Sequence, residues 1–82
     1  MQPMLFTASF TREDDLAAFE YEVIITPADG GLAWVARVTS DGTFRGRTTG
    51  LLTDMGDSDV ESLELAVRDL VETSIRDRAG IS

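Results

Sequence analysis

A stretch of alternating apolar and polar residues at 19–26 constrains the fold of this chain more than any other feature. Alternation with a period of two is typical of a β-strand that buries one face, and a second stretch at 32–39 repeats it. A third, more polar stretch follows at 43–49. The first two stretches would place these apolar residues on one face of a sheet: Phe19, Tyr21, Val23, Ile25, Leu32, Trp34, Ala36 and Val38.

The segments between these stretches have the composition of tight turns. Residues 28–31 and 40–42 are rich in Gly and Asp, which accept the positive φ angles that hairpin turns require. Pro27 is expected to end the first strand, because proline donates no hydrogen bond to a strand ladder. Together these features predict an antiparallel meander.

A single amphipathic helix is predicted after the sheet. Ser58 and Glu61 form an S-x-x-E capping box, and Gly80 is placed to be the C-cap. Two i,i+4 ion pairs are expected along the helix, Glu64 with Arg68 and Glu72 with Arg76. One stripe at helical spacing, predicted to pack against the apolar sheet face, gathers Val60, Leu63, Val67, Leu70, Val71, Ser74 and Ile75.

The N-terminal part of the chain allows two interpretations. Residues 4–10 have the composition of a further strand, whereas residues 11–14 could open a short helix over 12–18. The fold class is therefore α+β: an antiparallel three- to four-stranded meander packed against one long C-terminal helix. The core is βββα, with αβββα as the alternative order. Residues 1–82 are expected to form one small domain.

The residue inventory excludes several classes of function. The chain has no cysteine, histidine or lysine, so we predict a non-enzymatic protein with no cofactor. Its formal net charge of −8 opposes binding to phosphate backbones, so we expect no direct binding of nucleic acid. The longest apolar run, residues 32–36, is far shorter than a membrane helix, and the first ten residues do not resemble a secretory signal. We expect a cytoplasmic protein that does not enter membranes.

Two groups of charged residues are candidate ligand sites. Asp54, Asp57, Asp59 and Glu61 crowd the start of the helix, but their spacing does not match a calcium loop, and helix capping explains them without a metal. Arg37, Arg45 and Arg47 are the only local excess of positive charge. They are a candidate anion or partner patch on the open sheet face, although cross-strand pairing with Glu20 and Glu22 explains them as well.

Leu65 departs from the helical pattern, because it falls among charged residues on the side expected to face water. An exposed apolar residue ringed by carboxylates is a reasonable contact for a basic protein. We therefore predict one partner-binding helix face, made of Glu61, Leu65, Asp69 and Glu72. A homodimer through an edge strand is a competing interpretation.

Three segments of the chain share the pattern of a known family in the first strand, the following hairpin and the helix start: Phe19-Glu20-Tyr21-Glu22-Val23-Ile24-Ile25, Asp29-Gly30-Gly31-Leu32-Ala33-Trp34-Val35-Ala36 and Gly56-Asp57-Ser58 with Val60-Glu61-Ser62-Leu63-Glu64-Leu65-Ala66. Through them, residues 19–78 resemble the HicB-like antitoxin family, small domains with a partial ribonuclease-H-like β-β-β-α unit. The resemblance implies a protein that binds and neutralises a basic ribonuclease toxin.

Two other functions fit the same composition. If residues 12–18 are helical, the order αβββα is similar to a double-stranded-RNA-binding domain, here without a basic helix start and so suited to protein contacts. The acidic charge also fits an inhibitor or immunity-type protein that mimics nucleic acid.

Overall fold

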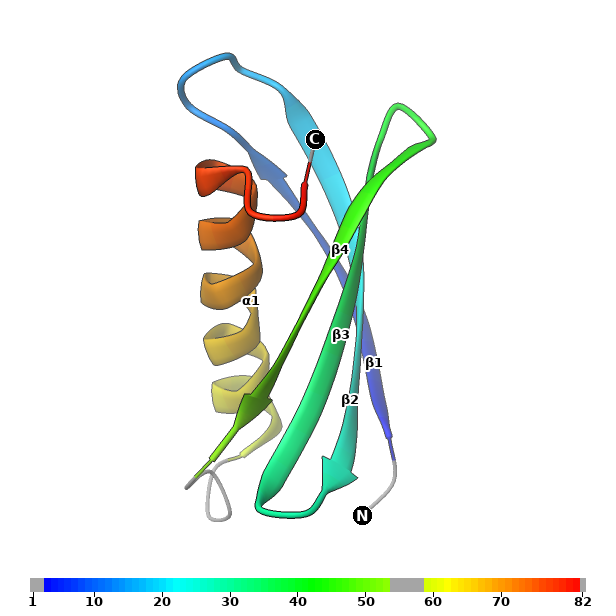
Figure 1. Ribbon diagram of the computed structural model, residues 1–82, viewed down its shortest axis with the longest axis vertical. Helices are drawn as coiled ribbons and strands as arrows, with labels where there is room; N and C mark the ends of the chain where they lie inside the picture. The colour runs from blue at the N-terminus through cyan, green and yellow to red at the C-terminus, as the bar shows by residue number, and fades with distance from the viewer. Residues whose placement is uncertain (1–2, 54–58, 82) are drawn as a thin grey trace.

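The computed structural model describes residues 3–53 and 59–81 (Figure 1). Four strands precede one helix: β1 (Met4–Thr11), β2 (Ala18–Ala28), β3 (Gly31–Ser40), β4 (Thr43–Leu52) and α1 (Val60–Asp77). The strands form one sheet in the order β1-β2-β3-β4, and every neighbouring pair is antiparallel. The α+β prediction of a meander with one C-terminal helix is confirmed, with four strands.

The N-terminal strand interpretation is correct, and the alternative order αβββα is wrong. Instead of a helix, the segment after β1 forms a turn, in which the Arg12 N–H donates to the carbonyl of Ala17 at 2.8 Å. The guanidinium of Arg12 also donates to the Ile75 carbonyl at the end of α1, at 3.3 Å. This long-range contact, which no local pattern reveals, fixes the end of β1.

β2 continues through Pro27 to Ala28, so the prediction that Pro27 ends the strand is wrong. In an antiparallel ladder, consecutive residues direct their N–H groups alternately to the two sides of the strand. Pro27 belongs to the set that faces β1, and the described pairing of β1 with β2 ends at Ile25. The missing N–H of Pro27 therefore removes no hydrogen bond between β2 and β3.

The ends of α1 differ from the predicted caps. Its N-cap is Asp59, whose carboxylate accepts from the Ser62 N–H at 2.8 Å; the predicted cap, Ser58, lies outside the described residues. Its C-cap is Arg78 in the left-handed conformation rather than Gly80, because the carbonyls of the last turn are already bonded before Gly80 is reached. No helix in the described part of the chain is long and apolar enough to cross a membrane.

The helix buries a narrower stripe than the sequence predicts. A straight i,i+4 row faces the sheet: Leu63, Val67, Val71 and Ile75. Val60 and Leu70 were expected in the core but are 56% and 42% exposed. The sheet covers only one side of α1, and Leu70 lies about 80° from the centre of the buried row at 100° per residue. The expectation of a core position is wrong for both residues.

Trp34 is a core residue, as predicted, and its packing depends on a glycine in the neighbouring strand. Gly50 lies directly opposite Trp34 in the pairing of β3 with β4. A Cβ atom at Gly50 would lie 2.7–2.8 Å from the indole ring. The missing side chain therefore makes room for the indole, a role that sequence reasoning did not assign to Gly50.

The chain returns to the sheet after α1, as Figure 1 shows. Ile81 is buried, and it forms an isolated antiparallel bridge with Gly46 of β4. Gly46 has φ +139°, and a Cβ atom there would clash with the carbonyl oxygen of Gly80. The glycine therefore allows the C-terminal segment to approach the edge of β4.

Candidate functional site

Three of the four residues predicted to bind a partner are exposed on α1. Leu65 is 57% exposed, and Glu61 and Asp69, four residues before and after it, are exposed as well. Residues four apart are neighbours on a helix surface, so the two carboxylates lie on either side of the leucine along the axis. The structure thus places an apolar side chain between two acidic ones on the side of α1 that does not face the sheet.

Glu72, the fourth predicted residue, belongs to the junction between helix and sheet. Its Oε2 accepts a hydrogen bond from the Tyr21 hydroxyl at 2.6 Å and lies 3.8 Å from Nε of Arg68. Glu72 is half-buried as a result. It was predicted to pair with Arg76, but the ion pair that it forms within the helix is with Arg68.

The Tyr21 hydroxyl lies at this junction in a partly desolvated position. Burial, followed by the hydrogen bond to the Glu72 carboxylate, raises the pKa of Tyr21 to about 12. Both effects favour the neutral phenol, because burial disfavours the phenolate and the carboxylate repels it. The pKa of the same side chain in an unfolded chain is about 10.

The raised pKa of Tyr21 leads to an expected loss of stability at alkaline pH. A group with a higher pKa in the folded state stabilises the protein below its unfolded pKa, and that contribution is lost as the pH rises through the folded value. The free energy of unfolding should therefore fall between about pH 10 and pH 12, by about 3 kcal/mol in all. Denaturant titrations across this range measure it.

Tyr21→Phe is the matched control for this titration, because it keeps the ring and removes the ionising group. Tyr21 is the only tyrosine, so the ultraviolet absorbance of tyrosinate reports this residue alone. A tyrosinate transition at pH 10, or an equal fall in stability in Tyr21→Phe, would contradict the expectation.

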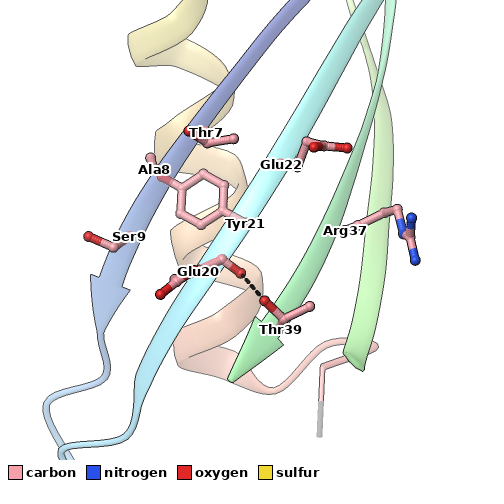
Figure 2. Close-up of a pocket in the computed structure, with 8 residues that line it drawn as sticks. All are labelled: Thr7, Ala8, Ser9, Glu20, Tyr21, Glu22, Arg37 and Thr39. Carbon is pink, nitrogen blue, oxygen red and sulfur yellow. Dashed lines mark hydrogen bonds between the residues drawn. The ribbon is translucent and has the colours of Figure 1, made fainter. Parts of the chain in front are cut away.

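The sheet face that α1 does not cover forms a shallow hollow of about 520 Å³ (Figure 2). Within it, the Thr39 hydroxyl donates to the carbonyl of Glu20 at 3.5 Å, drawn as the dashed line in Figure 2. The hollow thus presents two carboxylates, one guanidinium and three hydroxyls on a surface open to solvent. Its polar lining comes from Thr7, Ser9, Glu20, Glu22, Arg37 and Thr39.

Two of the three predicted patch arginines lie on this open face. Arg37 is directly opposite Arg47 in one direction and opposite Glu22 in the other, and its guanidinium lies 5.7 Å from the centre of the Phe44 ring. The pairing shifts by one residue just after Val38, so that Arg45 falls in the irregular part of β4. The bulge interrupts the alternation that would have aligned Arg45 with the other two arginines.

One end of the open face is apolar, which sequence reasoning missed. Leu5, Ile24 and Val35 are exposed and follow one another across β1, β2 and β3 in register. Leu51 of β4 is also exposed and pairs with Ala33. These residues occupy positions of the alternating pattern that are normally polar. An apolar residue at such a position is the sequence signal that could have identified this apolar end of the face.

The turn between β1 and β2 is held by an ion-pair network. Arg12 Nη2 lies 2.6 Å from Oδ2 of Asp15, and Arg78 Nη1 lies 2.9 Å from Oδ2 of Asp14. The hydrogen bond from Arg12 holds the pKa of Asp15 well below its usual range. The network leaves Leu16 exposed at the tip with φ +57°. This junction ties the turn to the end of α1.

Comparisons of the chain with protein-family models, with curated proteins and with solved structures found no match.

Proposed function

We propose that this chain is a non-enzymatic acidic binding module of the cytoplasm, which binds a basic protein through the outer face of α1. The observation that carries the proposal is the exposure of Leu65, 57%, between the carboxylates of Glu61 and Asp69. Over Val60–Asp77, five carboxylates stand against two arginines. The same helix thus offers an apolar anchor and an acidic surround.

The two features would act at different stages of binding. Carboxylates on the rim accelerate the encounter with a basic surface, whereas a leucine that enters an apolar pocket contributes once water has been excluded. The partner should therefore carry an apolar pocket bordered by Arg or Lys. Glu72 would contribute through its charge, since its position is fixed by Tyr21 and Arg68. The resemblance to HicB-like antitoxins suggests a basic ribonuclease toxin as that partner.

The test is an affinity capture from the native host with three forms of the full chain: wild type, Leu65→Glu and Val60→Glu. Val60 is 56% exposed, on the same helix, and about 140° away from Leu65 around the axis. The two variants therefore make the same charge change at equal exposure. We expect wild type and Val60→Glu to recover the same Arg- or Lys-rich protein, and Leu65→Glu to recover at least tenfold less.

The recovered protein is then purified and titrated against the three forms at increasing salt. We expect the association rate with wild type to fall as salt rises, because exposed charges are screened. Equal binding of Leu65→Glu and wild type would place the interface elsewhere. A recovered protein without basic character would contradict the proposed partner chemistry, and so would capture of no protein at all.

A further inference from the structure

The two edges of the sheet are treated differently by this chain. A protein normally blocks a free edge with charge, a bulge or a covering segment, because an unpaired edge attracts other strands. β4 has all three: Arg45 and Arg47, the shift in register, and the bridge from Ile81 to Gly46. That edge is protected against pairing with another chain.

Among the described residues, the opposite edge, β1, has no bulge and no charged residue of its own, and the one printed charge contact on it is Arg76 of α1, which lies 5.8 Å from the centre of the Phe10 ring on the helix side. Met4–Thr11 contains no charged residue and no proline, and its register with β2 runs without irregularity from Met4↔Ile25 to Thr11↔Ala18. Among the five elements, β1 alone carries no charged residue. An uncharged edge strand of eight residues in regular register is a template for strand pairing.

The hydrogen bonds show which groups of β1 point outwards. The Arg12 N–H donates to the Ala17 carbonyl, and this pair continues the register of β1 with β2. Hydrogen-bonded pairs alternate along an antiparallel ladder, so the even-numbered residues of β1 bond to β2. The N–H and C=O groups directed away from β2 therefore belong to Leu5, Thr7, Ser9 and Thr11.

We propose that β1 pairs antiparallel with β1 of a second copy of this chain, about a two-fold axis through Thr7, to form one eight-stranded sheet. With the axis perpendicular to the sheet, both helices lie on the same side. Facing residues are then either both even-numbered or both odd-numbered, so that their side chains point to the same side of the sheet. An axis through Thr7 pairs the residues in this way. The facing pairs are Thr7 with Thr7, Leu5 with Ser9, Phe6 with Ala8, and Met4 with Phe10.

A second copy fits this edge for two reasons. The helix-side residues of β1 are only half-buried where the sheet stops, so an identical strand would continue their apolar row. Two chains of net charge −8 also repel each other least where the approaching strands carry no charge. The row consists of Met4, Phe6, Ala8 and Phe10.

The first experiment measures the mass of the full chain by sedimentation equilibrium over a range of concentrations. We expect wild type to be a dimer that dissociates on dilution. Thr7→Pro removes the outward N–H on the axis without removing a bond to β2, and should shift the protein to monomer with its circular dichroism retained. Thr7→Val keeps the N–H and should remain a dimer. A monomeric wild type, or a Thr7→Pro protein as dimeric as Thr7→Val, would overturn the proposal.

The second experiment tests the register with two double variants on the exposed side of β1. Leu5→Lys with Ser9→Lys places like charges opposite each other twice, whereas Leu5→Glu with Ser9→Lys places opposite charges there. The dissociation constant of the first should exceed that of the second by about tenfold or more. Equal constants would overturn the register centred on Thr7.

The dimer proposal is argued from β1 and does not rest on the proposed binding face of α1. Failure of the partner capture would therefore not affect the dimer experiments, and a monomeric wild type would leave the α1 proposal in place.

Discussion

Leu63→Ala is expected to lower the free energy of unfolding by about 2–5 kcal/mol, whereas Leu70→Ala should cost less than about 1 kcal/mol. Both leucines lie on α1, and both belong to the apolar stripe seen in the sequence. Leu63 is 2% exposed and packs in the row that faces the sheet, whereas Leu70 is 42% exposed. Truncation leaves a cavity at the first site and only removes partly solvated surface at the second.

Urea denaturation of the two variants beside wild type measures this difference. Because the substitution, the helix and the residue type are the same, each variant is the other's control for helix propensity. If Leu63→Ala does not fold, Leu63→Val provides a milder truncation. It should still lower the free energy of unfolding more than the same substitution at Leu70. Equal losses at the two sites would contradict the packing of α1 on the sheet.

The strands and the helix were predictable because their signals are local. Alternation marked β2 and β3, and Asp-Gly and Gly-Gly segments marked the turns between strands. The N-terminal part of the chain was ambiguous because the strand and the short helix were both supported only by neighbouring residues. The choice depends on Arg12, which reaches the Ile75 carbonyl and the carboxylate of Asp15. A contact across 63 residues cannot be read from a window of ten.

The errors within the helix have a geometric cause. Periodicity identifies an apolar side of a helix, but the width that is buried depends on what covers it. One sheet covers a narrow row, which left Leu70 partly in solvent, whereas Val60 points in the direction of the row but is exposed because it is the first residue of the helix. The packing of Trp34 on Gly50 was also hidden from the sequence. An isolated glycine in a polar strand does not indicate that an indole ring occupies the space of the missing side chain.

The candidate surfaces were predictable to different degrees. Leu65 and Asp69 were placed correctly on an exposed helix face, because helical spacing determines which residues share a side. The hydrogen bond from Tyr21 to Glu72 was not predictable, since it joins residues 51 positions apart. The difference between the two sheet edges was also hidden, because the bridge from Ile81 to Gly46 closes only in the folded chain.

Gly46→Ala is expected to lower the free energy of unfolding by about 3–5 kcal/mol. Two costs contribute. A residue with a Cβ is strained at φ +139°, and the Cβ itself would clash with the carbonyl oxygen of Gly80. The C-terminal segment must then move away from β4, which exposes the buried side chain of Ile81. Gly42→Ala is the matched control, because Gly42 also has positive φ, +77°, with nothing within 4 Å of an added Cβ.

The control separates backbone strain from displacement of the C-terminal segment: Gly42→Ala should cost only about 1–2 kcal/mol. Ile81→Ala removes the anchor of the same segment, so its effect should not add fully to that of Gly46→Ala. Denaturant titrations of both single variants and the double variant measure the coupling. Additive losses, or equal losses for the two glycines, would show that Ile81 is held independently of Gly46. A large coupling would mean that closure of the β4 edge is part of the stability of the fold, which leaves β1 as the edge available for pairing.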